Sequence, residues 1–129
     1  MQGKPRILLV EDEDNIAIAI ELLLSREGYD ILRVADGSQA IPNIRAQHPD
    51  LVILDVTLPG KSGYEVCQSM RLTQDLTTVP VLMMSARASQ AEQRKGLAMG
   101  ANAFLTKPFA MDDLRSSVAE LITGDRHEN

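Results

Sequence analysis

The chain has 129 residues, of which 44% are hydrophobic and 24% charged, and its net charge is −5. This length suits one domain with a real core. The acidic balance argues against a dedicated nucleic-acid module, which needs clustered Lys and Arg. There is no apolar run of about 18 residues that could span a membrane and no apolar signal segment, and the single cysteine, Cys67, has no internal partner. We therefore expect a cytoplasmic protein that contacts neither nucleic acid nor membrane directly.

Short apolar runs alternate along the chain with longer amphipathic segments. The apolar runs predict five strands, at 6–10, 30–34, 51–54, 81–84 and 103–106. Runs of four or five apolar residues are typical of strands that are covered on both faces, as in a parallel sheet.

The amphipathic segments predict five helices, at 15–28, 38–47, 63–72, 89–100 and 111–122. Asp14 is placed to cap the first helix and Gly28 to end it. Its expected apolar stripe consists of Ile16, Ala19, Ile20 and Leu23. Ser38 is expected to cap the second helix, and Pro42 to kink or shorten its first turn.

Five β-α units in alternation predict an α/β fold, a flavodoxin-like, doubly wound (βα)5 domain. Right-handed crossovers make its five-stranded sheet parallel, in the order 2-1-3-4-5, with helices on both faces. We expect the domain to occupy residues 6–122, between an N-terminal extension of residues 1–5 and a flexible C-terminal tail of residues 123–129.

Polar residues follow the predicted strands, and in an open α/β sheet ligands bind beyond the carboxyl ends of the strands. Glu11 and Asp12 follow the first strand, Asp55 the third, Ser85 the fourth and Lys107 the fifth. Three carboxylates in one crevice repel one another, and Mg²⁺, which prefers oxygen ligands, relieves that repulsion. Asp12 and Asp55 can each give the ion one oxygen, and Glu11 can act directly or through water.

Asp55 is the candidate phosphoacceptor, because a carboxylate can attack phosphorus to give an aspartyl phosphate. Mg²⁺ would cover one phosphoryl oxygen and Lys107 would pair with another as a point charge. The Ser85 hydroxyl and nearby backbone N–H groups, including that of Ala86, would hold the third. Each of these residues alone has an ordinary structural explanation as a cap, a turn or a surface residue, but their convergence favours a functional site.

Four motifs that close predicted strands resemble the receiver domain of two-component response regulators, of the chemotaxis-regulator-like kind. They are "LLVEDED", "LVILDVTLPGKSG", "MMSA" and "FLTKPF", and the resemblance covers residues 6 to about 122. It implies that the phosphodonor is a phosphohistidine on a sensor histidine kinase or phosphotransfer protein. It also implies that Thr57 gives the metal its backbone carbonyl.

The resemblance further implies a conformational switch. Ser85 would move toward the phosphoryl group, and the aromatic residue on the last strand, Phe104, would turn inward. The surface of the fourth helix, fifth strand and fifth helix would then change and control a downstream protein partner. Lys107–Pro108 resembles the cis peptide of the family, since X-Pro bonds are those in which cis is accessible.

Several positions leave alternatives open. Thr57 and Arg87 flank the site and, by resemblance, influence how long the phosphoryl group survives. Arg87 could shield that group or pair with Glu13 or Asp12, and Glu13 could be a solvated charge or tune access to the metal. The charged set with which many relatives dimerise is incomplete at Asn102, Ala103 and Ser117. We therefore expect a monomer or a weak phosphorylation-dependent dimer.

Two other functions compete with the switch. A Mg²⁺-dependent phosphohydrolase acting through Asp55 would resemble haloacid dehalogenases, which place a second acid where Thr57 stands and add a cap domain. A flavodoxin-like cofactor binder would need a phosphate-binding loop after the first strand, where four carboxylates would repel FMN. The sequence favours a signalling switch that catalyses only its own phosphotransfer and slow autodephosphorylation, and it identifies neither the kinase nor the output.

Overall fold

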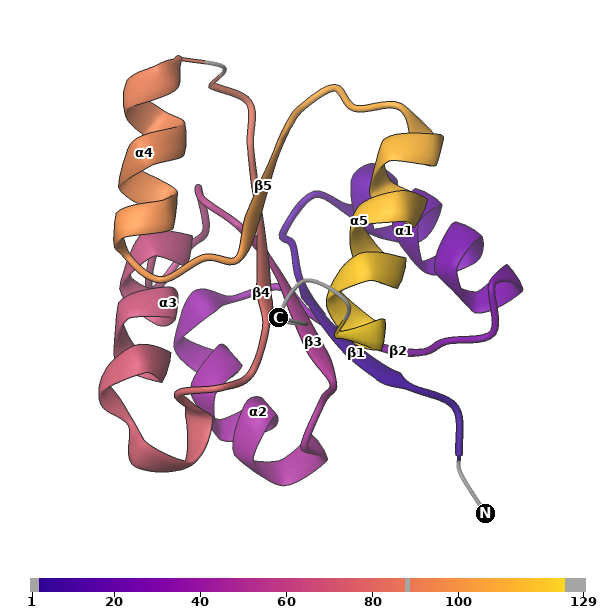
Figure 1. Cartoon of the computed structure of the whole chain (residues 1–129), viewed down its shortest axis with the longest axis horizontal. Helices are drawn as coiled ribbons and strands as arrows, with labels where there is room; N and C mark the ends of the chain where they lie inside the picture. The colour runs from indigo at the N-terminus through magenta and orange to yellow at the C-terminus, as the bar shows by residue number, and fades with distance from the viewer. Residues whose placement is uncertain (1–2, 88, 125–129) are drawn as a thin grey trace.

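The computed structural model describes residues 3–87 and 89–124, which form one parallel sheet with helices on both faces (Figure 1). The five strands pair in the order β2-β1-β3-β4-β5, so the predicted fold and strand order are confirmed. The strands are β1 (Arg6–Val10), β2 (Asp30–Val34), β3 (Leu51–Asp55), β4 (Val81–Ser85) and β5 (Ala103–Thr106). The helices are α1 (Asp14–Arg26), α2 (Ala40–Gln47), α3 (Gly63–Leu72), α4 (Gln90–Ala98) and α5 (Met111–Thr123), with short 3₁₀ turns η1 (Gly37–Gln39) and η2 (Gln74–Leu76).

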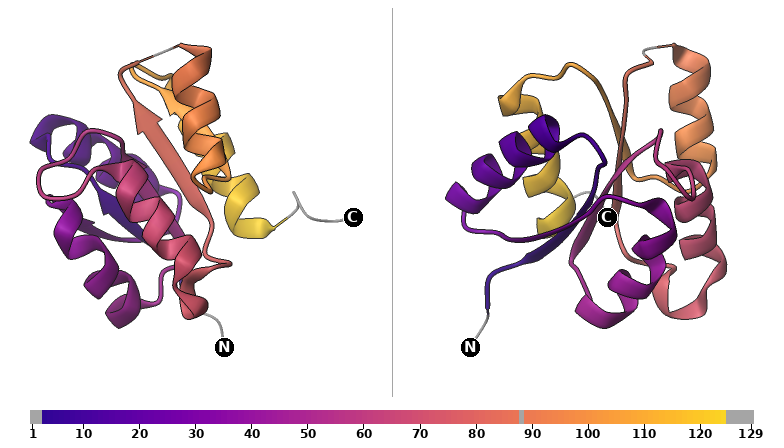
Figure 2. Two further views of the ribbon diagram at one scale, coloured as in Figure 1. Left: turned by 90° about the vertical axis from the view of Figure 1, so that its left-hand side faces the viewer. Right: turned by 180° about the vertical axis from the view of Figure 1, so that it is seen from behind.

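The sheet separates two apolar layers. Successive side chains of a strand point to opposite faces, so Leu8 and Val10 pack into one layer while Ile7 and Leu9 pack into the other. The first layer is covered by α2, α3 and α4, and the second by α1 and α5 (Figures 1 and 2). The apolar residues of β1, β3 and β4 are fully buried because helices cover both of their faces.

The start of α1 differs from the prediction. Asp14 lies inside the first turn instead of capping the helix, and the cap position is held by Glu13. The Asp14 side chain instead pairs with Arg33 of β2, whose Nη1 lies 2.9 Å from its Oδ1, and a carboxylate in the first turn interacts favourably with the helix dipole. The fully buried residues of α1 are Ala17, Ile20 and Leu24, so the predicted stripe is confirmed at Ile20 and missed Ala17 and Leu24. Ile16 and Leu23 only flank that stripe.

The start of α2 also differs, because local hydrogen bonds form a separate turn before it. The Asp36 carboxylate accepts both the N–H (2.7 Å) and the hydroxyl (2.6 Å) of Ser38, which makes η1. The predicted capping role of Ser38 was therefore wrong. The helix begins only at Ala40, and Pro42 falls in its first turn, where an N–H would have no intrahelical partner.

The ends of the predicted domain are described in part. Thr123 belongs to α5, so the segment expected to be a flexible tail begins inside that helix. Residues 125–129 of this segment and residues 1–2 of the N-terminal extension lie outside the described residues. Within the described part of the chain, no helix combines the length and the apolar character that crossing a membrane requires.

A close approach at the start of α3 positions the carboxyl end of β3. The Gly63 N–H donates to the Val56 carbonyl at 2.8 Å, and a Cβ on Gly63 would collide with the carbonyl oxygen of Asp55. Ser62 and Glu65 form a reciprocal capping box in which each side chain accepts the N–H of the other residue. Helix α3 therefore begins directly beside Asp55.

We expect Gly63→Ala to lower the free energy of unfolding by about 1–3 kcal/mol, the usual cost of an inserted methyl group in a packed site. This would happen although alanine is the better helix former by about 1 kcal/mol. Urea denaturation measures the change, and Gly3→Ala is the matched control because nothing lies within 4 Å of its added Cβ. Equal stability of the two variants would contradict the close approach.

Candidate functional site

The carboxyl ends of β1, β3 and β5 meet around one lysine. Lys107 Nζ lies 2.9 Å from Glu11 Oε1 and 3.0 Å from Asp55 Oδ1. All three side chains are nearly buried, with 11% of Lys107, 0% of Glu11 and 7% of Asp55 exposed. The predicted convergence of these residues is therefore found, and the Lys107–Pro108 peptide is cis as predicted.

Three carboxylates form a candidate cation site. Glu11, Asp12 and Asp55 each place one carboxylate oxygen within 4.8 Å of the others, with only Asp12 exposed. Glu11 already has a partner for each oxygen, because Oε1 contacts Lys107 and Oε2 accepts the Glu13 N–H at 3.1 Å. This hard-oxygen donor set fits Mg²⁺, with Asp12 and Asp55 better placed than Glu11 to contact the ion directly.

Burial changes how the site titrates. Burial raises the pKa of Asp55 from 3.8 to about 6, and the charges of Glu11 and Asp12 add to the rise while Lys107 opposes it. Burial lowers the pKa of Lys107, but its hydrogen bonds and charge interactions with Glu11 and Asp55 outweigh this and raise it. The lysine thus stays charged while the neighbouring carboxylates still repel one another, and a divalent cation would relieve that repulsion.

The end of β4 supplies the small polar residues that were predicted at this edge. Ser85 is buried, its carbonyl accepts the Lys107 N–H at 2.7 Å, and its hydroxyl accepts the Arg87 N–H at 3.0 Å. A hollow opens over the site and is lined by Asp12, Glu13, Asp55, Thr57, Ala86 and Lys107. Every residue predicted to hold metal or phosphate thus lies at this edge of the sheet.

Phe104 lies away from this edge, halfway along β5. Its ring packs, half-buried, against the first apolar layer, close to Gly96 of α4 and Met83 of β4. A side chain added at Gly96 would meet the ring, so the glycine makes room for it. Because Phe104 lies beneath α4, a change in the orientation of its ring would alter the α4 surface.

Sequence reasoning missed Arg33 on the edge strand β2. Its Nε donates to the Glu11 carbonyl at 2.9 Å, while its Nη1 pairs with Asp14. These contacts tie the β1–α1 loop, which carries Asp12, to the edge of the sheet. The sequence signal that could have indicated this role is a single positive charge between the apolar residues Leu32 and Val34 of a predicted strand.

A second missed group surrounds Glu92 of α4. The sequence left the partner of Arg87 open, and the structure places its Nη1 3.7 Å from Glu92 Oε2. Glu13, the other residue left open, belongs to the first site, where its Oε1 lies 3.9 Å from Lys107 Nζ. Glu92 Oε1 accepts the hydroxyl of Tyr64 from α3, and Lys95 Nζ lies 4.5 Å from the Tyr64 ring centroid. Burial, followed by the hydrogen bond to Glu92, raises the pKa of Tyr64 to about 12.

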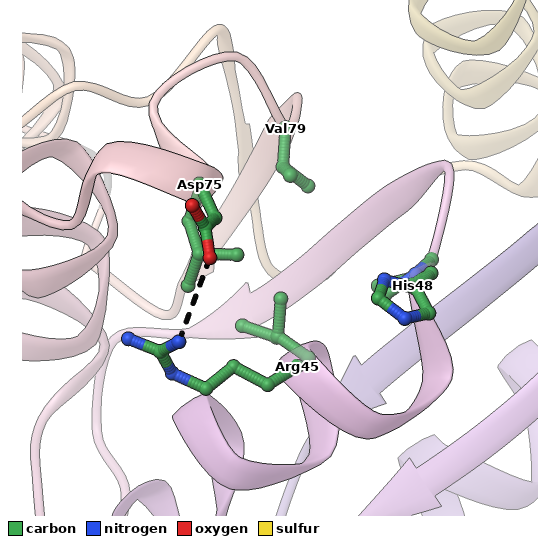
Figure 3. A pocket seen from close by; sticks show the side chains of 7 residues that line it. Arg45, His48, Asp75 and Val79 are labelled. Atoms are coloured by element: carbon green, nitrogen blue, oxygen red, sulfur yellow. Dashed lines mark ion pairs between the residues drawn. The ribbon is translucent and has the colours of Figure 1, made fainter.

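A further hollow lies at the opposite end of the sheet, before the starts of β3 and β4 (Figure 3). An ion pair between Arg45 and Asp75, 3.7 Å apart and largely exposed, crosses it. It is lined by Ile44, Arg45, His48, Pro49, Asp75, Leu76 and Val79. None of the residues singled out as site candidates from the sequence lies there.

A doubly wound sheet whose strand ends present an acidic trio and a buried lysine is the arrangement that a receiver domain is expected to have. The chain belongs to the response regulator receiver domain family, whose model matches residues 7–119. It is thus a receiver domain of two-component systems.

Relatives and solved structures agree with this assignment. The probable transcriptional regulator ycf27 of Cyanophora paradoxa is 37% identical over 93% of this chain and 49% of the relative. A putative response regulator from Chloroflexus aurantiacus is 35% identical with a TM-score of 0.90, covering 94% of this chain and 99% of that one. The receiver domain of a Pseudomonas aeruginosa sensor histidine kinase was solved with a magnesium ion coordinated in its active-site cleft. It is 32% identical with a TM-score of 0.86, covering 94% of this chain and 99% of that one.

The chain spans about half the length of the curated relatives that it matches.

The raised pKa of Asp55 makes stability depend on pH when no divalent cation is present. Such a carboxyl stabilises the fold fully only below its unfolded pKa, near 3.8, and this contribution is lost as the pH rises through about 6. Because Asp55→Asn removes the titrating group, we expect its free energy of unfolding to gain up to about 3 kcal/mol relative to wild type between about pH 4 and about pH 7.5 in chelator. Urea denaturation across this range measures the gap.

The matched control is the same comparison in saturating Mg²⁺. The cation favours the ionised carboxylate, so the pH-dependent part of the gap should shrink. A gap in chelator that stays constant across the pH range would contradict the raised pKa.

Proposed function

We propose that this receiver domain is a phosphorylation-controlled switch in which Asp55 accepts a phosphoryl group with the help of Mg²⁺. The observation that carries the proposal is the arrangement around Asp55: two further carboxylates within 4.8 Å and the Lys107 ammonium at 3.0 Å. This places an anionic nucleophile beside both a candidate cation site and a fixed positive charge, which is what phosphoryl transfer to a carboxylate requires.

The transfer itself is a displacement at phosphorus. An oxygen of Asp55 forms a bond to the phosphorus of a phosphohistidine, the P–N bond breaks, and the histidine leaves with that electron pair and takes up a proton. Lys107 would neutralise one phosphoryl oxygen as a point charge. The Ser85 hydroxyl and the Ala86 N–H would donate to another, so positioning and charge neutralisation account for most of the catalysis.

We assign the metal ligands from the partners that each oxygen already has. Asp12 and Asp55 would hold Mg²⁺ directly, whereas Glu11 would act through water because Lys107 and the Glu13 N–H occupy its oxygens. The resemblance to receiver domains adds the backbone carbonyl of Thr57 as a further ligand. When bound, the ion would neutralise charge on the phosphoryl group and its nucleophile. The magnesium ion in the cleft of the Pseudomonas aeruginosa receiver domain supports this choice of metal.

The switch would begin at Ser85. The Ser85 hydroxyl can donate to the phosphoryl group while its oxygen still accepts the Arg87 N–H, so a movement of Ser85 would draw the loop before α4 toward Asp55. Phe104 would then turn inward from its place beside Gly96, and the α4–β5–α5 surface would change. We propose a sensor histidine kinase or phosphotransfer protein as the donor and a downstream protein as the partner of that surface.

The first test is modification by a small acyl phosphate in Mg²⁺, followed by intact mass measurement. We expect one phosphoryl group on the wild-type protein and none on Asp55→Asn or in chelator, because nucleophile and metal would both be needed. Asp75→Asn, a change in an exposed carboxylate far from the site, is the matched control and should be modified normally. The same adduct on Asp55→Asn would refute the assignment, and multiple turnover of phosphate esters would instead indicate a phosphohydrolase.

The second test separates phosphorylation from switching. We expect Lys107→Ala to accept the phosphoryl group, because nucleophile and metal ligands remain, yet to lose the bond that draws β5 and α4 toward it. Amide shifts around Phe104 on phosphorylation should therefore fall to a small fraction of their wild-type size by NMR. The exposed Lys61→Ala serves as control.

Removal of Lys107 leaves the buried Glu11 uncompensated, which costs about 3–5 kcal/mol. The NMR spectra are therefore recorded in Mg²⁺, and dispersed amide signals confirm that the variant is folded. Wild-type shift changes in folded, phosphorylated Lys107→Ala would show that the lysine does not transmit the signal.

A further inference from the structure

A groove beside the phosphoacceptor site contains a polar cluster that the proposed chemistry does not use. The groove runs between the β3–α3 connection and α4, and Thr57 lines both this groove and the hollow over Asp55, so the two adjoin. Its lining residues are Val56, Thr57, Leu58, Ser62, Tyr64, Arg87, Glu92 and Lys95. It thus brings two cations and one carboxylate close to the place where phosphoryl charge would appear.

Glu92 is the centre of this cluster. One of its carboxylate oxygens accepts the Tyr64 hydroxyl, and the other lies 3.7 Å from Arg87 Nη1. The Glu92 side chain is 23% exposed and that of Arg87 is 78% exposed. The bond to Tyr64 therefore fixes the carboxylate in a partly buried position, while the contact with Arg87 lies in solvent and is weak.

Arg87 is connected to the phosphoacceptor site by its backbone. Its N–H donates to the Ser85 hydroxyl at 3.0 Å, and the preceding residue, Ala86, lines the hollow over Asp55. The same residue thus touches the switching serine through its main chain and Glu92 through its side chain. A movement of Ser85 would carry Arg87 with it.

We propose that Glu92, held in place by Tyr64, competes with the phosphoryl group on Asp55 for the Arg87 guanidinium and so shortens the life of the aspartyl phosphate. The proposal rests on the proposed phosphorylation of Asp55. A phosphoryl group attracts guanidinium as a doubly charged, bidentate acceptor. Glu92 offers Arg87 a single, loosely held alternative on α4. The fraction of time that Arg87 spends at the phosphoryl group or at Glu92 is set by the difference in free energy between these two contacts.

The step affected is hydrolysis of the acyl phosphate. Water adds its oxygen to phosphorus, and the bond between phosphorus and the Asp55 oxygen breaks with its electron pair staying on Asp55. Inorganic phosphate leaves with the oxygen and both protons of the water, and Asp55 regains its carboxylate. The Arg87 side chain lines the adjoining groove and not the hollow itself. Once paired with the phosphoryl group, it would cover the open side of the hollow and hinder the approach of water. Glu92 and Tyr64 are positioning residues for Arg87 and touch no reacting atom.

The test compares phosphoryl lifetimes. Protein phosphorylated with a small acyl phosphate in Mg²⁺ is desalted, and the loss of the adduct is followed by intact mass. Glu92→Gln keeps the size of the side chain and an acceptor for the Tyr64 hydroxyl but removes the charge that attracts Arg87. We expect it to lengthen the half-life about two- to fivefold, as removal of a weak competing ion pair would do.

Two further variants make the result specific. Arg87→Ala should shorten the half-life, and Arg87→Ala/Glu92→Gln should match Arg87→Ala alone, because Glu92 acts only through Arg87. Glu120→Gln on the exposed surface of α5 is the matched control for the change in net charge and should leave the half-life unchanged. A structural role of Glu92 would not depend on Arg87 in this way.

An unchanged half-life in Glu92→Gln, or equal lengthening with and without Arg87, would overturn the inference while leaving the phosphoacceptor role intact. Absence of any adduct on the wild-type protein would overturn the proposed function and this inference together.

Discussion

The buried contact of one ammonium group with two carboxylates determines the rest of the site. Lys107 leaves the end of β5 and reaches across β4 to Asp55 on β3 and Glu11 beyond β1. That path is open because β4 ends in small residues, Ser85 and Ala86. One cation among these acids compensates only part of their charge, and the remaining negative charge is what a divalent ion would bind. The strand order is therefore the reason that the candidate metal site and the candidate phosphoacceptor coincide.

The cation at Asp55 and the cation in the adjoining groove differ in their surroundings. Lys107 is almost completely buried and held at a fixed distance from the carboxylate, whereas the Arg87 side chain is largely exposed and shares a weak contact with α4. A buried charge of this kind contributes constant electrostatic stabilisation, while an exposed one can change partners at little cost. If Asp55 is phosphorylated as proposed, exposed residues beside the hollow would therefore adjust phosphoryl lifetime without altering how the site accepts the group.

Much of the fold and site could be predicted because both depend on simple patterns. Apolar runs marked every strand to within a residue, and the rule that ligands bind at strand ends brought Asp55 and Lys107 together. The two misplaced caps have different causes. Asp14 pairs with Arg33 on another strand, which local sequence does not reveal, whereas the Ser38 hydroxyl bonds to Asp36 two residues earlier in a local turn that competes with capping. The cluster around Glu92 joins side chains from α3, α4 and their loops, so only the folded chain brings them into contact.

The division of the core by the sheet has a mechanical consequence. Phe104 and its surroundings belong to the layer beneath α2, α3 and α4, whereas the neighbouring residues Ala103 and Leu105 pack on the other side with α1 and α5. In the proposed switch, a rearrangement of the aromatic ring would therefore begin in the layer beneath α4, and it would reach α5 in the opposite layer only through β5. The sheet would thus determine the order in which the two sides of the α4–β5–α5 surface respond.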